Sequence, residues 1–402
     1  MKRRDPKTMA PWLLMLAVLS IGLQDSAASA ISPAIASICA SYPNIDPSVI
    51  QLMVTFPSLA ICIMSPLYGY LTTRIAPRKL ILFGLVMFVA GGMLPLIIDS
   101  LPLILFCRII LGIGAGITLP GAISIIPVFY DGQRKNNMLG WNMTVGSFGC
   151  IFMQAVGGFG AEVNWHLSFL GYIIGVYSLI ITFLFLPDIP KSVVVDNEGR
   201  TKNSVLAMLK KIPAAGYGEL ILYFIVTVFM TMLTSNLSLY IEGEQIGTAS
   251  ATGLGLSIYM AGALVGSAGF GFLKKRMNYY VIPLSWLILG CGYYFVTLSS
   301  TISTLYAALL LSGVGVGIIV PGYYGRLEEL SDTSVAAFAT GLVASVQGIA
   351  TFLNPVVGSW FVIYAGFRYG KSLIVLDAAA LAAGAVIIAV GRTAVKKKQI
   401  GE

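Results

Sequence analysis

Two side chains of opposite charge lie inside long apolar stretches of this sequence, where an isolated charge is costly. Asp25 follows about 15 residues of an apolar segment that begins at Ala10, and Arg108 interrupts the apolar run 101–129. With a rise of 1.5 Å per residue, Asp25 would lie near the middle of a membrane-spanning helix. Insertion scales give a cost of about 2.5–3.5 kcal/mol for such a charge, so residues of this kind usually pair, bind a ligand or carry protons.

Asp25 is the strongest candidate for proton binding. Gly22, Ser29 and Ser32 share its face of the expected helix and form a narrow polar stripe on an otherwise apolar surface. A carboxyl group there can take up and release a proton as its access to water alternates between the two sides of the membrane. The alternative is a permanently buried carboxyl held by a helix end or by hydroxyl groups. The neighbouring Gln24 is a candidate for substrate binding or charge pairing.

Three interpretations of Arg108 are open. Its guanidinium would pair with Asp25 and take part in proton coupling, bind an anionic substrate, or donate to backbone carbonyls of the first span. We predict pairing or proton coupling. The glycine-rich stretch after Arg108 recurs 201 residues later, but Leu309 stands at the position equivalent to Arg108. The charge therefore belongs to one half of the chain, and the repeated fold does not require it.

The repeated stretch has a physical role of its own. Residues 112–121 and 313–322 share the pattern Gly-x-Gly-x-Gly-Ile-x-x-Pro-Gly. Glycines four residues apart let helices approach closely, and a proline inside a helix permits a kink. Bending at a gate and static tight packing would use the same residues, so both interpretations stay open. The gating candidates from this pattern are Gly112, Gly116, Pro120, Gly313, Gly317 and Pro321.

The composition indicates a multi-spanning helical membrane protein. Of 402 residues, 57% are hydrophobic and 10% are charged, with a mean hydropathy of +0.87. A soluble domain carries about 25% charged residues. The apolar runs are too long for core helices and match the thickness of a bilayer. We predict an all-α integral membrane protein with twelve transmembrane helices, at 10–40, 48–72, 79–98, 101–129, 137–159, 166–187, 216–241, 250–273, 279–299, 302–325, 334–363 and 372–391.

The distribution of basic residues predicts the orientation. With the N-terminus in the cytoplasm, all but three of the 25 basic residues fall in cytoplasmic segments, the exceptions being Arg108, Arg368 and Lys371. Such an excess marks the cytoplasmic side. We therefore predict a multi-pass protein of the cell membrane with both termini cytoplasmic. Contact with anionic lipid headgroups accounts for the net charge of +8, which argues against nucleic acid as a partner.

The longest polar stretch divides the chain into two similar halves. We predict an N-terminal six-helix bundle over 1–187, a cytoplasmic central loop over 188–215 and a C-terminal six-helix bundle over 216–402. With six spans in each half, the two copies have the same orientation. This is the arrangement of parallel repeats related by an axis along the membrane normal.

Polar side chains recur at helical spacing in the seventh and eleventh spans. Such a stripe faces something other than lipid, either a substrate or a neighbouring helix. The sequence does not distinguish the two, and for the eleventh span we favour helix packing. The candidates for substrate contact are Tyr223, Thr227, Thr231, Asn236, Gln347 and Asn354.

Several motifs resemble those of the major facilitator superfamily of secondary transporters. The segment 69–79 resembles its loop between spans two and three, although Thr73 replaces an Asp and Ala76 a glycine. Arg108 and Gly112 resemble its intramembrane Arg-x-x-x-Gly. Residues 149–158 resemble its antiporter signature, with Met-Gln in place of Gly-Pro, and the repeat in the eleventh span keeps the proline. The resemblance implies gating roles for Gly69, Arg74, Arg78, Gly157, Gly158 and Pro355.

The resemblance also implies a function. It implies a monomeric transporter that moves a small organic solute by alternating access, with spans one, four, seven and ten lining the cavity and Asp377 in a peripheral span. We predict proton-coupled efflux of an amphipathic compound by antiport. The alternative is proton-coupled uptake or exchange of a small organic anion, as a symporter would perform, with Arg108 as ligand. A membrane sensor without transport is a third hypothesis.

No sequence pattern supports an enzyme, a cofactor or a metal site. The five cysteines and the single histidine, His166, lack metal-ligand spacing. Walker, nucleophile-elbow and His-Glu-x-x-His sequences do not occur. The expected partners are therefore a small-molecule substrate, protons and membrane lipid.

Overall fold

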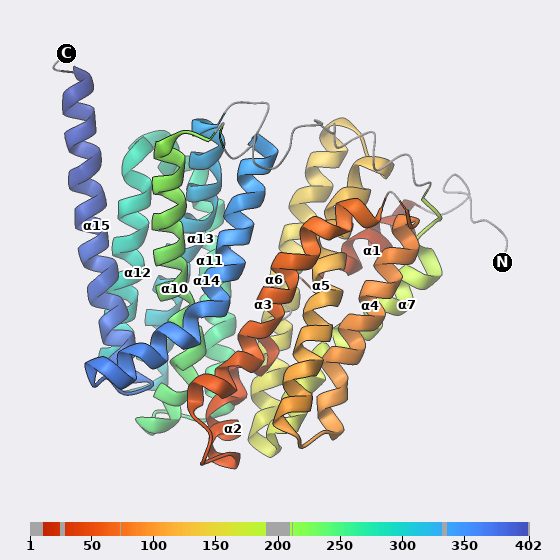
Figure 1. Ribbon diagram of the computed structural model, residues 1–402, viewed down its shortest axis with the longest axis horizontal. Coiled ribbons are helices and arrows are strands. Elements are labelled where there is room, and N and C mark those ends of the chain that lie inside the picture. The colour runs from red at the N-terminus through yellow and green to blue at the C-terminus, as the bar shows by residue number, and fades with distance from the viewer. Residues whose placement is uncertain are drawn as a thin grey trace. The chain divides into compact units, whose positions relative to one another are not determined.

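The computed structural model describes residues 11–24, 29–72, 74–189, 210, 212–331 and 336–400. Over these ranges the chain is built from helices and their connections, without a strand (Figure 1). Eleven of the described helices are long and apolar enough to cross a membrane, and they coincide with the second to twelfth predicted spans. The prediction of an all-α membrane protein is therefore confirmed.

The first predicted span is not one continuous helix. It comprises α1 (Pro11–Gly22), the 3-10 helix η2 (Ser29–Ala34) and α2 (Ile35–Ser41). Pro33 lies inside η2, where its missing N–H interrupts the helical hydrogen bonds. Asp25, the predicted proton site, lies outside the described residues.

The remaining helices follow in chain order with short connections. Those before the central polar stretch are α3 (Pro47–Leu71), α4 (Pro77–Met93), η3 (Leu94–Ile97), α5 (Leu101–Phe129), α6 (Gly132–Val163), η4 (Trp165–Tyr172) and α7 (Ile173–Phe185). Those after it are α10 (Ala214–Gly243), α11 (Ala249–Met277), η5 (Asn278–Tyr280), α12 (Val281–Leu298), α13 (Ile302–Leu330), α14 (Ala336–Ala365) and α15 (Lys371–Ile400).

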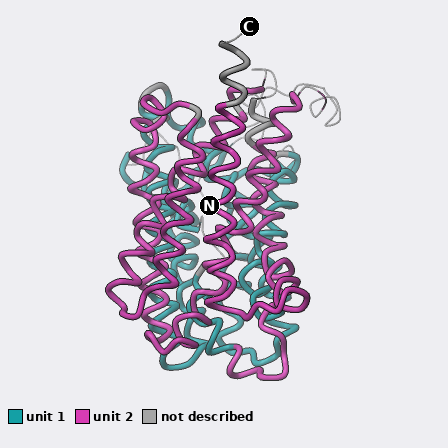
Figure 2. The backbone as a smooth tube through the Cα atoms, turned by 90° about the vertical axis from the view of Figure 1, so that its left-hand side faces the viewer, with its two compact units in different colours: residues 1–38, 49–202 teal, residues 39–48, 203–402 magenta. Residues whose placement is uncertain are grey.

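The chain forms two compact units, coloured separately in Figure 2. Unit 1 comprises Met1–Ile38 and Val49–Lys202, and unit 2 comprises Cys39–Ser48 and Asn203–Glu402. Unit 2 thus includes a short segment around the α2–α3 connection, in addition to the C-terminal half of the chain. Each unit has its own buried apolar core.

The glycines of α5 allow close helix packing in unit 1. A Cβ atom added at Gly112 would meet Pro57 and Ala60, and one at Gly116 would meet Met64, all on α3. Gly114, on another face of α5, approaches Phe88 of α4 in the same way. The glycines on two faces of α5 therefore allow the backbones of two neighbouring helices to approach closely.

Unit 2 repeats this packing with the second glycine run. A Cβ at Gly313 would overlap the Tyr259 carbonyl oxygen, and one at Gly317 would overlap that of Ala263, both on α11. Gly315 approaches Leu289 of α12. The spacing found in the sequence thus corresponds to the same pair of contacts in both units. Pro120 and Pro321 lie inside α5 and α13, as predicted for helices that can kink.

Replacing Gly317 with alanine should destabilise the protein. The added methyl group would overlap the Ala263 carbonyl oxygen, and such overpacking costs about 1–3 kcal/mol, more than the gain in helix propensity of about 0.5–1 kcal/mol. The measurement is thermal unfolding of the purified protein in detergent. Gly271→Ala is the matched control on α11, because nothing lies within 4 Å of its new Cβ. Equal melting temperatures for the two variants would contradict this packing.

Candidate functional site

Arg108 is enclosed within unit 1. Its side chain is fully buried, and its guanidinium carbon lies 4.9 Å from the ring centroids of both Phe169 and Tyr172 in η4. Nη2 donates to the carbonyl oxygens of Gly91 and, at 3.4 Å, of Gly92 in the third span, α4. Nε and Nη1 have no hydrogen-bond partner among the described residues. Aromatic faces and carbonyl dipoles stabilise the charge, and the guanidinium points toward the third and sixth spans.

Gln24 links the first span to α5. It is fully buried, and the Thr118 hydroxyl donates to its Oε1 at 3.1 Å. Thr118 lies ten residues after Arg108, about 15 Å along the helix axis. Gln24 therefore contacts α5 about 15 Å along the helix axis from the level of Arg108. Pairing of Arg108 with Asp25 stays a prediction.

The glycines of α6 hold the first span on both sides of residues 25–28. Cβ atoms added at Gly149 and Gly157 would overlap the carbonyl oxygens of Leu23 and Ala30. Gly158 is buried in the same helix. These contacts hold the backbone at Leu23 and Ala30, which flank Asp25 in the sequence.

A polar and aromatic cluster lies in unit 2, where α10, α13 and α14 meet. The Tyr223 hydroxyl donates to Gln347 Oε1 at 3.0 Å, which brings together the predicted stripes of the seventh and eleventh spans. The Tyr223 ring lies 5.1 Å from that of Tyr323 and 6.4 Å from that of Tyr324. Trp286 Nε1 donates to the Tyr323 hydroxyl at 3.1 Å. The cluster offers aromatic faces and neutral hydrogen-bonding groups.

Apart from Tyr223, the aromatic members of this cluster were not among the residues predicted from sequence. Tyr323 and Tyr324 follow Pro321-Gly322 directly, and Pro321 is a predicted gating residue. The signal was their position just beyond this proline. Trp286 carried no signal, because a single buried tryptophan is indistinguishable from a core residue.

The other polar candidates of unit 2 make mostly backbone hydrogen bonds. Thr231 donates to the Thr227 carbonyl at 2.8 Å, and Asn236 donates to the Met232 carbonyl at 3.0 Å within the same helix. Asn354 donates across to the Val228 carbonyl of α10 at 2.9 Å, while its Oδ1 has no partner in the described part of the chain. Pro355 lies beside it inside α14. Asn354 therefore joins α14 to α10 and keeps one acceptor available.

The loop motif of unit 1 forms an ion pair. Arg78 Nη1 contacts Asp188 Oδ1 at 2.9 Å, and Nη2 donates to the Phe183 carbonyl at 2.9 Å. Arg74 is exposed and lies 5.3 Å from the Tyr70 ring. Gly69 lies within α3. Arg78 thus ties the start of α4 to the end of α7.

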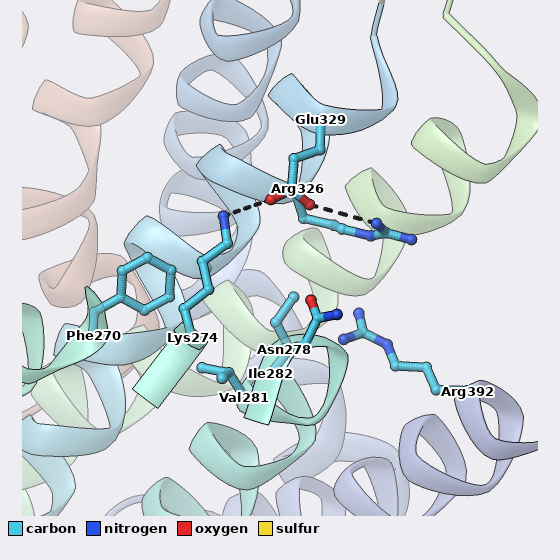
Figure 3. Close-up of a pocket in the computed structure, with 9 residues that line it drawn as sticks. Phe270, Lys274, Asn278, Val281, Ile282, Arg326, Glu329 and Arg392 are labelled. Atoms are coloured by element: carbon cyan, nitrogen blue, oxygen red, sulfur yellow. Dashed lines mark ion pairs between the residues drawn. The ribbon is translucent and has the colours of Figure 1, made fainter. Parts of the chain in front are cut away.

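A larger ion-pair network lies at the end of unit 2 where α11 ends (Figure 3). Glu329 contacts Lys274 at 2.6 Å and Arg326 at 3.6 Å, as the dashed lines show. Glu219 contacts Arg392 at 2.9 Å and Arg326 at 3.5 Å. The cavity between these residues has a volume of about 20 Å³, room for little more than one water molecule. The network joins α10, α11, α13 and α15 and has no space for an organic substrate.

A wider cavity of about 480 Å³ lies at the opposite end of unit 2, where α10 and α15 approach the α14–α15 connection. Its lining includes the Lys371–Glu244 ion pair, 2.8 Å apart, and Tyr369, whose hydroxyl donates to Asp46 at 2.8 Å. Partial burial raises the pKa of Asp46, but hydrogen bonds from Ser48 and Tyr369 outweigh it and hold the pKa below its usual range. This end of the bundle therefore contains both water-accessible space and charge.

Removing the Tyr223 hydroxyl should destabilise unit 2. Tyr223→Phe leaves the Gln347 oxygen without its donor, at a cost of about 1–3 kcal/mol, whereas replacing both partners with apolar groups is close to neutral. In thermal unfolding, the double variant Tyr223→Phe, Gln347→Leu should therefore be at least as stable as the single variant Tyr223→Phe. Tyr294→Phe, at a side chain 54% exposed on α12, is the control. Additive losses in the double variant would contradict this contact.

The sequence of this chain is similar to those of known bacterial proteins. The chain is 22% identical over 327 residues to the quinolone resistance protein NorA of Staphylococcus aureus, covering 76% of this chain and 79% of the relative. It is 23% identical over 325 residues to the uncharacterized MFS-type transporter YcnB of Bacillus subtilis, covering 79% of this chain and 60% of the relative.

Solved transporters share the fold. A nucleoside transporter, NupG, superimposes with a TM-score of 0.74 at 14% identity, covering 95% of this chain and 98% of that one. A D-xylose-proton symporter does so with a TM-score of 0.69 at 16% identity, covering 94% and 97%. The family model of the Major Facilitator Superfamily matches residues 14–243 and 220–402. This chain belongs to the major facilitator superfamily of membrane transporters.

Proposed function

We propose that this transporter exports a small amphipathic organic compound in exchange for protons. The observation that favours export of such a compound over transport of an anion is the enclosure of Arg108. Its guanidinium lies near two aromatic rings and donates to the backbone of α4, so its contacts are with residues of unit 1. The cluster around Tyr223 and Gln347 instead offers aromatic and neutral polar groups, which suit an amphipathic solute.

Asp25 carries the exchanged proton in this proposal. The buried Gln24 and the α6 glycines hold the backbone on both sides of it, and Gln24 Nε2 has no described partner. An acid at the depth predicted from the sequence would bind a proton from one side of the membrane and release it to the other as the cavity alternates. The bundles of the two halves, divided by the 188–215 loop, rock around the substrate. The similarity to a quinolone resistance protein supports export.

The distribution of basic residues supports the proposed location. Arg78, Arg326, Lys274 and Arg392 lie at helix ends expected to face the cytoplasm, in ion-pair networks within their units. We place the protein in the cell membrane as a monomer with both termini cytoplasmic.

A second candidate is proton-coupled uptake or exchange of a small organic anion. Nε and Nη1 of Arg108 have no described hydrogen-bond partner, and two guanidinium nitrogens suit a carboxylate. Such a ligand would have to enter unit 1 between α5 and η4.

Proteoliposomes with an imposed pH gradient test the leading proposal. Asp25→Asn should abolish proton-driven transport of organic cations and neutral amphipathic compounds, because the amide cannot exchange a proton. Asp131→Asn, at an exposed position before α6, is the matched control and should transport normally. Unchanged proton-driven transport by Asp25→Asn would refute the coupling role.

Arg108→Leu distinguishes the two candidates. Under the leading proposal it lowers protein stability, because the aromatic and carbonyl contacts of the guanidinium are lost, and it does not alter the preference among substrates. Binding of cationic, neutral and carboxylate compounds to the purified variant is the measurement. Loss of carboxylate binding alone would favour the anion transporter.

A further inference from the structure

Asp377 lies in the core of unit 2, and the mechanism above does not use it. Its side chain is 0% exposed, and neither carboxyl oxygen has a hydrogen-bond partner among the described residues. It lies six residues after Lys371, where α15 begins, about 9 Å along the helix. An ionised carboxylate without a partner at such a site carries a very large desolvation cost, so the group is neutral and holds a proton.

Asp377 interacts with a neutral tyrosine of the neighbouring helix α12. Tyr293 of α12 interacts with it electrostatically and donates its hydroxyl to the Met230 carbonyl of α10 at 2.9 Å. Tyr259 of α11 lies next to Tyr293, and Tyr240 of α10 donates to carbonyls at the end of α12. All three tyrosines are buried.

The described acidic residues of α10 lie at or near the two ends of that helix. Glu219 of α10 pairs with Arg392 of α15 at one end of the bundle, and Glu244 pairs with Lys371 at the other. Glu242 lies near the same end as Glu244, two residues beyond Tyr240. No described cation therefore compensates a negative charge on Asp377.

A cavity lies at one end of the bundle, near the start of α15. The cavity of about 480 Å³ between α10 and α15 extends along α15 as far as Val375, two residues before Asp377. In the proposed orientation this end is extracellular. Val375 lies about 3 Å along the helix axis from Asp377 but on the opposite side of α15, so the packing of α15 has to change before water from this cavity reaches the carboxyl.

We propose that Asp377 is a second proton-binding site, loaded from the side of the membrane on which α14 and α15 join. The proton leaves when the packing of α10 and α12 against α15 changes. A purely structural acid would donate its proton to a fixed acceptor, and none is found among the described residues. The role of this proton in transport rests on the proposed proton coupling, but its presence on Asp377 does not.

Infrared spectroscopy of the purified full-length protein in lipid tests the site directly, because the carbonyl stretch of a protonated carboxyl group is separate from that of a carboxylate. At neutral pH the wild type should show a protonated-carboxyl band that Asp377→Asn lacks and the control Asp131→Asn keeps. Asp377→Glu should shift the band. This variant retains a carboxyl group, so it tests the site even if the asparagine variant does not fold. A spectrum unchanged by both Asp377 variants would overturn the proposal.

Transport in proteoliposomes tests whether the proton moves. With ethidium as the amphipathic probe, Asp377→Asn should slow pH-driven export about tenfold while ethidium binding is retained, and Asp377→Glu should restore most of the rate. Export by Asp377→Asn at the wild-type rate would overturn the proposal, since the proton would then be static. If the wild type moves ethidium without a pH gradient, the coupling proposal fails, while the infrared band still tests the site.

Discussion

The hydrocarbon of a bilayer supplies no hydrogen bonds, so each polar group inside these bundles must be satisfied by protein. Most are. Asn354 donates to the backbone of α10, Tyr223 to Gln347, and Tyr293 to the backbone of α10. Such bonds tie helices together and explain how an apolar chain packs with defined geometry. Among the described residues, several buried side-chain atoms have no hydrogen-bond partner, including atoms of Arg108, Gln24 and Asp377. Because an unsatisfied group is costly, these positions are where function is expected.

The glycine runs provide the mechanical counterpart of these polar contacts. In unit 1, α5 meets α3 and α4 through alternating glycines, and in unit 2, α13 meets α11 and α12 through the equivalent residues. A smooth backbone surface allows sliding with little change in side-chain packing, and the prolines at 120 and 321 permit bending near the same level. The duplicated frame therefore supplies close helix packing in both units, whereas the buried charged residues Arg108 and Asp377 each belong to one unit.

The sequence predicted the spans and the faces used by the glycines, because hydropathy and spacing are properties of one helix at a time. It could not predict the partners of Arg108. Which neighbour a side chain meets depends on helix rotation and order, so the carbonyls of Gly91 and Gly92 and the rings of Phe169 and Tyr172 gave no signal. The same holds for Asp377, whose isolation is set by three other helices. The first span also contains a 3-10 helix that includes Pro33, which hydropathy does not register.

Proton exchange with an amphipathic substrate is the central claim, and it predicts that the two ligands compete. Substrate binding to the purified transporter in weakly buffered solution should then release protons in proportion to the protein, which a pH indicator dye measures alongside a calorimetric binding curve. Release should follow the binding curve and disappear in Asp25→Asn. Substrate binding without any release of protons would contradict the account.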